Sequence, residues 1–211
     1  MKQAAQDPTT LVICCGAVAR EIVGLVSENG WTHIRVECLP AHLHNSAAHI
    51  PEGVRAKIRA NRDRYDEILV LYTDCGTHGA LDKVLEEEGI ERVSGGHCYE
   101  VYAGLESYAE MCRAELGTLF LTDFLVRHFE RLIVKGLGLD RHPKLLQRYF
   151  AQYKKLVYLA QSENPELETK ARAAADRIGL EYEKWLTGRG GFGEFLASRS
   201  AAAMPPRGSA A

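Results

Sequence analysis

The chain has 211 residues, of which 46% are hydrophobic and 26% are charged, a composition that can bury the core of one domain. The formal net charge of -2 and the lack of a strong basic block give no indication of a nucleic-acid partner. The N-terminal sequence MKQAAQDPTT lacks the apolar core of a signal peptide, and no apolar stretch approaches the roughly 20 residues of a membrane helix. We therefore expect a cytoplasmic protein that contacts neither nucleic acid nor membrane and keeps its six cysteines reduced.

Three stretches of the chain share one order of elements, an apolar strand, a turn, a helix and a second strand. Each is about 30 residues long, the size of one βαβ unit. Gly30, Gly89 and Gly179 are placed where glycine ends a helix, and Asn164 is a good N-cap before Pro165. The three stretches are 11–40, 68–98 and 156–188.

Continuously apolar strands separated by helices predict an α/β fold, a three-layer sandwich with a mainly parallel sheet. The three βαβ units form this sheet in a single domain over residues 1–197. A mainly helical insertion is expected over about residues 99–153, within which 117–121 reads as a short strand or a helix start. Residues 198–211, SRSAAAMPPRGSAA, have little to bury and are expected to form a disordered tail.

Cysteines follow or end four successive predicted strands. Ligands of parallel α/β sheets bind beyond the carboxyl ends of the strands, so these thiols are expected to meet at one edge. His44 follows the second of these strands, and His97 directly precedes the cysteine that follows the fourth. The four strand ends carry Cys15 (with Cys14), Cys38, Cys75 and Cys98.

Thiolate and imidazole ligands suit zinc, and thiolates suit iron–sulfur clusters. No CxxC pair is present, which argues against a zinc finger, whereas ligands on separate loops are typical of a catalytic metal site. The sequence therefore predicts a zinc ion or a [4Fe-4S] cluster at this edge. The expected ligands are Cys15, His44, Cys75 and Cys98.

Two further groups are candidates for catalysis or for binding a cofactor. Asp74 and His97 would orient ligands or move protons. Asp123 reads either as a helix-start residue or as an acid/base residue. The turns containing Gly76, Thr77 and Gly96 could hold a phosphate on backbone amides, although neither matches GxGxxG or a P-loop.

A metal-free alternative uses Cys75 as a nucleophile. Its predicted place before a helix N-terminus would lower the pKa of the thiol. His97 or His78 would then act as the base.

Several strings of the sequence resemble a prokaryotic family, the domain of unknown function 1638 family, over about Leu11 to Gly188. The resemblance implies shared polar positions at Cys15, His44, Cys75, Cys98 and Asp123, and an association with corrinoid methyltransferase systems. It leaves Cys14, Cys38 and Cys112 as features of this sequence. The strings are LVICCGAVAREI, LPAHLHN, YTDCGTHGALD, GGHCYE, GTLFLTDFLVRHFE, GLGLDRHP and YLAQSENPEL.

The leading functional hypothesis is a metal-dependent enzyme acting on a small polar metabolite. Zinc would activate a substrate thiol for methyl transfer, whereas an iron–sulfur cluster would act as a Lewis acid in lyase chemistry. The second hypothesis is a non-enzymatic carrier that holds a metal or a corrinoid for a partner methyltransferase. A third is an α/β binding domain without a metal.

Overall fold

The computed structural model describes residues 9–203, and its chain divides into two compact units. Unit 1 contains residues 9–101 and 189–203 of the described chain, and unit 2 contains residues 102–188. Both are α/β units, each built around a sheet of three parallel strands. The α/β class predicted from the sequence is therefore confirmed, whereas the six strands form two sheets in place of the single sheet expected.

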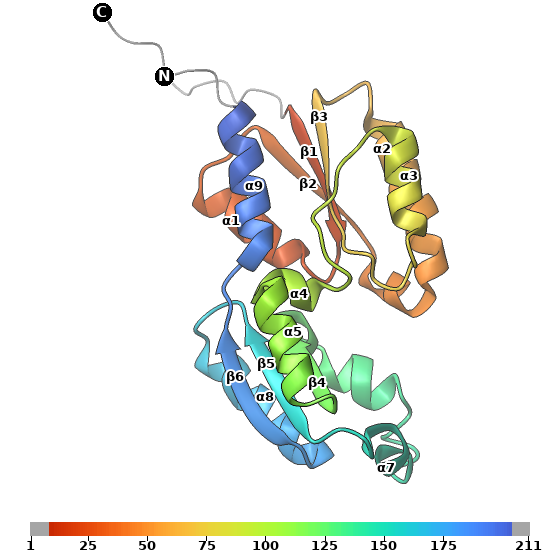
Figure 1. Cartoon of the computed structure of the whole chain (residues 1–211), viewed down its shortest axis with the longest axis vertical. Coiled ribbons are helices and arrows are strands. Elements are labelled where there is room, and N and C mark those ends of the chain that lie inside the picture. Colours follow the sequence, from red (N-terminus) through yellow and green to blue (C-terminus); the bar gives the residue numbers. More distant parts are fainter. Residues whose placement is uncertain (1–8, 204–211) are drawn as a thin grey trace, which may run out of the picture. The chain divides into compact units, whose positions relative to one another are not determined.

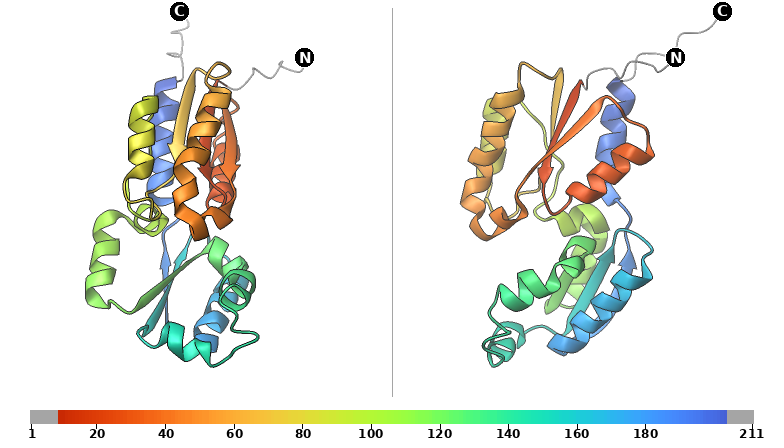
Figure 2. Two further views of the ribbon diagram at one scale, coloured as in Figure 1. Left: turned by 90° about the vertical axis from the view of Figure 1, so that its right-hand side faces the viewer. Right: turned by 180° about the vertical axis from the view of Figure 1, so that it is seen from behind.

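The sheet of unit 1 has the order β2-β1-β3. Helices α1 and α9 lie on one face of this sheet, and α2 and α3 lie on the other (Figure 1; Figure 2, right). The bounds are β1 Thr10–Cys15, α1 Ala19–Glu28, β2 Ile34–Leu39, the 3-10 segment η1 Ala41–His49, α2 Ile50–Asn61, β3 Glu67–Leu71, α3 Ala80–Glu88 and α9 Gly190–Ala203. The helix α4, Cys98–Ala103, crosses the boundary between the units.

Strand β1 is buried along its whole length because it lies between two strands and two helical layers. This burial explains its uninterrupted apolar sequence, Leu11–Cys15, which showed no alternation. Gly16 directly follows β1, and a side chain at this position would meet the Leu39 carbonyl oxygen at 2.9 Å. A glycine is therefore needed where the chain leaves β1 beside the end of β2.

The strand expected near Val93 is reduced to one isolated bridge, between Val70 and Arg92. The segment that contains it still runs along the outer edge of β3. Val93 N–H donates to the Val70 carbonyl at 3.1 Å, and Asp74 N–H donates to the Gly95 carbonyl at 3.1 Å. These hydrogen bonds occupy the β3 edge that a further strand would need, which gives a physical reason why β5 belongs to another sheet.

The sheet of unit 2 has the order β4-β5-β6. Strand β4 lies inside the insertion expected to be mainly helical, because its apolar run pairs with β5 from Thr118↔Lys155 to Thr122↔Leu159. The bounds are α5 Leu105–Ala114, β4 Thr118–Thr122, α6 Asp123–Arg127, the π-helical segment η2 Glu130–Lys135, α7 Leu145–Phe150, β5 Lys155–Ala160, α8 Pro165–Ile178 and β6 Glu181–Leu186.

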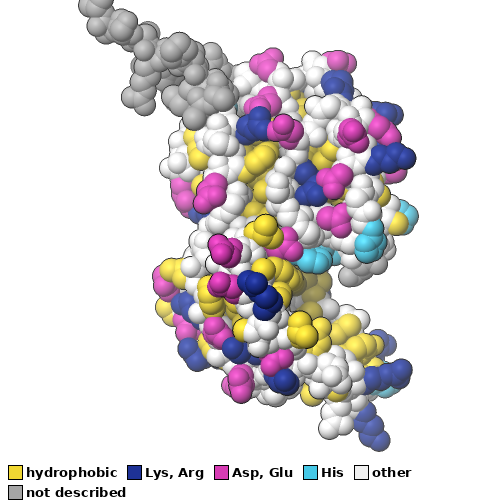
Figure 3. Space-filling model, viewed as in Figure 1, with side chains coloured by type: hydrophobic (Ala, Val, Ile, Leu, Met, Phe, Trp, Pro, Cys, Tyr) yellow, Lys and Arg dark blue, Asp and Glu magenta, His cyan; other side chains and the backbone are white. Residues whose placement is uncertain are grey.

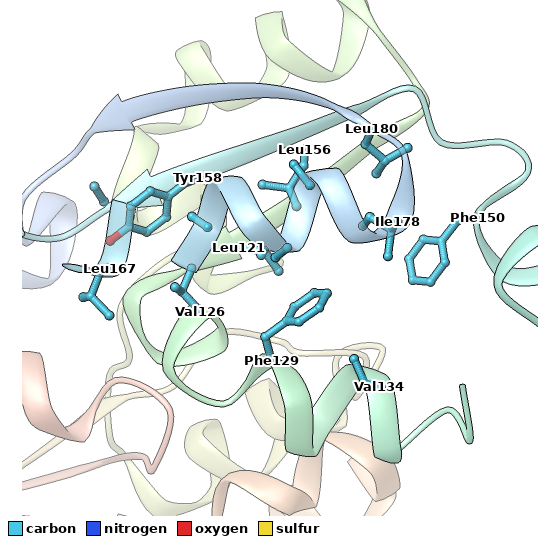
Figure 4. Packing of buried hydrophobic residues seen from close by; sticks show 14 of the residues in the cluster. Leu121, Val126, Phe129, Val134, Phe150, Leu156, Tyr158, Leu167, Ile178 and Leu180 are labelled. Carbon is cyan, nitrogen blue, oxygen red and sulfur yellow. The ribbon is translucent and has the colours of Figure 1, made fainter. Parts of the chain in front are cut away.

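Unit 2 has its own hydrophobic core between its sheet and the helices α6 and α8 (Figure 4). Leu156 and Tyr158 of β5 and Leu121 of β4 point into this core, where Phe129 meets them from the segment after α6. Helix α8 begins as predicted, since the Asn164 side chain accepts a hydrogen bond from Leu167 N–H at 3.1 Å and Pro165 follows. Gly179 ends the helix in a left-handed conformation, φ +74°.

The C-terminal end of the described chain corrects one expectation. Residues 198–203 of the expected disordered tail are helical and complete α9. Phe192 and Leu196 are buried in unit 1 and anchor the helix, and Ser198 continues it with a hydrogen bond to the Phe195 carbonyl. Alanine has the highest helix propensity, so the alanines at the end of α9 extend the anchored helix. Residues 204–211 of the expected tail lie outside the described residues.

Candidate functional site

The four predicted metal ligands lie together in unit 1. Cys15 ends β1, Cys75 follows β3, Cys98 begins α4, and His44 is carried by η1 after β2. All four side chains line one cavity of about 10 Å³. The remaining lining is mostly apolar and consists of Ala17, Val18, Leu71, Thr73 and Phe192.

The chain brings these residues together because parallel strands present their carboxyl ends at one edge of a sheet. Cys75 is fixed there by its own N–H, which donates to the Gly96 carbonyl at 2.9 Å. Cys75 also has a left-handed backbone conformation, φ +48°, followed by Gly76 at +82°. A non-glycine residue in this region costs about 1–2 kcal/mol, so the surrounding hydrogen bonds hold the Cys75 thiol in place against a local conformational cost.

His44 touches two of the thiols. Its Nδ1 lies 3.6 Å from Cys15 Sγ and 3.2 Å from the Ala41 carbonyl oxygen. The interaction of the ring with Cys75 is the largest cause that raises the pKa of His44. If Nδ1–H donates to the Ala41 carbonyl, the other ring nitrogen carries the free lone pair, which is the arrangement typical of a metal-binding histidine.

The thiols have few conventional hydrogen-bond partners. Cys15 Sγ accepts from Ala17 N–H at 3.3 Å, and Cys75 Sγ lies 2.8 Å from the Thr73 hydroxyl. Burial raises the pKa of Cys15 and of Cys98, and the neighbouring thiols of Cys75 and Cys15 raise that of Cys98 further. A cation would relieve this penalty, because thiolate charges that repel each other are stabilised by a shared metal ion.

Tyr72 is a neighbour of the site that the sequence did not single out. It is fully buried, and its hydroxyl has no partner that meets hydrogen-bond geometry. Burial is the largest cause that raises the pKa of Tyr72, followed by its proximity to Cys15 and then to Cys75. A thiolate at Cys15 would give this buried hydroxyl a strong acceptor.

Among residues 9–203, no three His, Cys, Asp or Glu side chains are already arranged to hold a metal ion. The four side chains share a cavity, but their sulfur and nitrogen atoms do not yet converge on one point. Cys75 is turned to the Thr73 hydroxyl, and His44 is turned to the Ala41 carbonyl. A metal ion shared by these four residues would therefore require some of their side chains to rotate.

Asp74 lies beside the site and serves the turn itself. Its carboxylate accepts hydrogen bonds from the Thr77 hydroxyl at 2.6 Å and from the N–H groups of Gly79 and His78 at 2.9 and 3.1 Å. Burial raises the pKa of this carboxyl group, but the hydrogen bonds outweigh it and the pKa is lowered. Asp74 thus remains ionised and shapes the loop that presents Cys75.

The same contacts bear on the predicted phosphate cradle. The N–H groups of His78 and Gly79 already bind the Asp74 carboxylate, and Gly96 N–H donates to Glu100 at 2.6 Å. Thr77 is buried, with its hydroxyl on Asp74. Carboxylates of the chain thus occupy these amides, and the arrangement does not favour an external phosphate at Gly76, Thr77 or Gly96.

The remaining candidates lie apart from the cavity. His97 and His78 are exposed and do not line it, so the imidazole beside Cys75 is that of His44. Asp123 belongs to unit 2, where it is 1% exposed. Its carboxylate accepts from Tyr158 Oη at 2.6 Å, from Gln161 N–H at 3.0 Å, from Ser162 Oγ at 3.1 Å and from Arg127 at 3.5 Å.

Sequence reasoning missed the neighbours that complete the site. Tyr72 and Thr73 directly precede the Asp74-Cys75 pair, and their position before a reactive turn was a usable signal. Phe192 reaches the cavity from α9, more than ninety positions along the chain from Cys98. No local pattern could have indicated Phe192, because its place depends on the return of the chain to unit 1.

Comparison with known proteins supports one assignment. Residues 38–194 match the family described as Protein of unknown function (DUF1638). The chain belongs to the DUF1638 family. His44, Cys75, Cys98 and Asp123 lie within the matched residues, and Cys15 precedes them. No curated protein and no solved structure matches this DUF1638 protein.

The described chain has no helix that is both long enough and apolar enough to cross a bilayer. On the face shown in Figure 3, Lys and Arg side chains are interspersed with Asp and Glu side chains. This mixed pattern over most of that face agrees with the small net charge.

Proposed function

We propose that unit 1 binds a single zinc ion through Cys15, His44, Cys75 and Cys98, and that the protein is a metal-dependent enzyme acting on a small polar metabolite. The observation that carries this proposal is the shared cavity, which is lined by Cys15 at the end of β1, His44 of η1, Cys75 after β3 and Cys98 of α4. Three thiols and one imidazole are a ligand set that zinc commonly takes. All six cysteines lie in the described chain as free thiols, in keeping with a reducing cytoplasm, where we place the protein.

The cavity volume favours one ion over a cluster. About 10 Å³ is close to the smallest space that holds one water molecule. A [4Fe-4S] cluster or a corrinoid would require the apolar wall of Val18, Leu71 and Phe192 to move apart. Zinc is therefore the preferred occupant among the cofactors considered.

A bound zinc ion would act as a Lewis acid that lowers the pKa of a coordinated thiol or water. The chain itself supplies the surroundings of that chemistry. Phe192 and Leu71 exclude water, Asp74 fixes the turn of Cys75, and the Tyr72 hydroxyl lies where it can donate to Cys15. His44 is the exposed member of the set, whereas Cys75 and Cys98 are half-buried and Cys15 is buried. We expect a small thiol to approach the ion from the His44 side.

A zinc titration against a competing chelator tests the site. The native chain is expected to bind one zinc per chain, and Cys75→Ser is expected to lose more than about 100-fold in affinity, beyond the usual effect of losing a partner that only orients a ligand. Cys112→Ser is the matched control, since Cys112 lies in unit 2 and outside the cavity. Equal affinities of the native chain and Cys75→Ser would contradict the proposal.

One observation favours a second candidate, a non-enzymatic zinc carrier for a methyltransferase system. The cavity has room for little more than one ion, and His44, one of its lining residues, is exposed. Zinc-loaded protein mixed with a small thiol and a methylated corrinoid separates the two candidates. Repeated formation of the methyl thioether supports the enzyme, whereas transfer of zinc to an acceptor without thioether formation supports the carrier.

A further inference from the structure

Two cysteines of unit 1 take no part in the proposed zinc site. Cys14 ends β1 together with Cys15, and Cys38 lies in β2. The two strands are parallel and in register, so that Cys14 and Cys38 are direct partners. Neither lines the cavity that the other thiols share.

The side chains of Cys14 and Cys38 lie on the same face of the sheet, opposite to that of Cys15. Leu39 faces α2, because its side chain lies 2.9 Å from where a side-chain carbon at Gly53 would stand. Successive side chains of a strand alternate between faces, so Cys38 faces the α1 side. Cys14 does the same, because in-register partners on neighbouring parallel strands point to the same face of the sheet.

The spacing of the strands allows these two thiols to be bridged. Neighbouring strands are about 4.8 Å apart, and in-register partners have Cα atoms at about this distance. Two cysteines joined by a disulfide have Cα atoms roughly 4.4–6.8 Å apart and Cβ atoms about 3.8 Å apart. The Cβ atoms would have to approach each other by about 1 Å, so the bridge would be strained and easily reduced.

The two thiols differ in their access to solvent. Cys38 is exposed on the edge strand β2, whereas Cys14 is completely buried. An oxidant in solution therefore reaches Cys38 first, and Cys14 is the thiol held directly beside it.

We propose that Cys14 and Cys38 form a redox-active pair, in which a hydroperoxide oxidises Cys38 and Cys14 closes the disulfide. The Cys38 sulfur attacks the terminal peroxide oxygen and becomes a sulfenic acid, and the O–O bond breaks to release an alcohol, or water from hydrogen peroxide. Cys14 then attacks the Cys38 sulfur, the S–S bond forms, and the sulfenic hydroxyl leaves as water with the Cys14 proton. The peroxide is reduced, and the two thiols are oxidised by two electrons in total. The pair does not depend on a metal at the neighbouring site.

The full-length chain, reduced and freed of reductant, is treated with a small excess of hydrogen peroxide and then alkylated. Trypsin places Cys14 in peptide 3–20 and Cys38 in peptide 36–55. The expected product is a link between these peptides that dithiothreitol reverses. Because Cys15 shares the first peptide, the Cys15→Ser variant assigns the link, and it is expected to retain it.

Two variants complete the test. Cys38→Ser, at an exposed position, is expected to abolish the link, and Cys14→Ser is expected to accumulate a Cys38 sulfenic acid that dimedone traps. The Cys112→Ser control keeps the link. A link that is lost in Cys15→Ser but kept in Cys14→Ser, or peroxide-treated protein in which Cys14 and Cys38 both remain open to alkylation, would overturn the proposal.

Discussion

The two units place reactive residues at the same position of the same architecture, with different results. In unit 1, thiols follow or end the carboxyl ends of parallel strands and line a common cavity. In unit 2, Asp123 follows β4 at the corresponding edge and is buried against the end of β5. The position alone therefore does not distinguish a functional group from a structural one.

Hydrogen bonding does distinguish them. The Asp123 carboxylate accepts four hydrogen bonds, from Tyr158, Gln161, Ser162 and Arg127. These donors occupy its acceptor sites and connect the end of β4 to β5. The thiols of unit 1 have few conventional partners, and the Tyr72 hydroxyl among them has none at full hydrogen-bond geometry. We infer that Asp123 holds unit 2 together, and that the cysteine cluster of unit 1 is completed by a ligand.

The largest effect is expected from Asp123→Ala. The change leaves the Tyr158 hydroxyl and the Gln161 N–H buried without their acceptor, at a cost of about 3 kcal/mol in the free energy of unfolding. Urea denaturation of the native chain and the variant measures this difference. Asp140→Ala, at an exposed aspartate of the same unit, is the control and is expected to change stability by less than about 0.5 kcal/mol. If the Asp123→Ala protein is as stable as the native chain but no longer binds zinc, Asp123 has a functional role and the inferred structural role is wrong.

A smaller effect is expected from Asp74→Ala. The variant removes the acceptor that holds the turn around Cys75, so zinc affinity is expected to fall about tenfold while the metal stoichiometry stays at one. Chelator competition measures the affinity. His97→Ala is the matched control and is expected to leave it unchanged, since His97 does not line the cavity. If His97→Ala weakens binding as much as Asp74→Ala does, the ligand set is wrong.

The smallest effect concerns a carboxylate of unit 1 that already has hydrogen-bond partners within the chain, as Asp123 has in unit 2. Glu88 of α3 binds Arg62 at 2.7 Å and Arg59 at 2.8 Å, and these arginines lower its pKa. A group whose pKa is lower in the folded state stabilises the protein above its unfolded pKa of about 4.3, and this contribution is lost as the pH falls through the folded value.

The native chain is therefore expected to be more stable than Glu88→Gln at pH 6, with the difference shrinking as the pH falls below about 4. Thermal unfolding across this range checks the trend. Glu166→Gln is the control, because Glu166 makes an exposed pair with Lys170 one helical turn away. A difference that grows as the pH falls would refute this role of Glu88.

The clustering of the cysteines was easier to predict from the sequence than the division of the strands into two sheets. Two of the cysteines could be found because short apolar runs mark strand ends: Cys15 ends one such run, and Cys75 follows another by a few residues. Cys98 follows only the isolated bridge at Arg92. The division into two sheets could not be found, because it depends on which edge of β3 the segment around Val93 occupies and on the pairing of β4 with β5. The role of Asp123 depended on partners such as Tyr158 and Ser162, more than thirty positions away.

The most direct test of the account is X-ray absorption spectroscopy at the zinc edge of the full-length protein loaded with one equivalent of zinc. The account predicts three sulfur neighbours at about 2.3 Å and one nitrogen neighbour at about 2.0–2.1 Å. In Cys75→Ser, one sulfur neighbour is expected to be lost. A zinc ion surrounded only by nitrogen and oxygen, or a chain that retains no zinc after desalting, would contradict the assignment of Cys15, His44, Cys75 and Cys98 as its ligands.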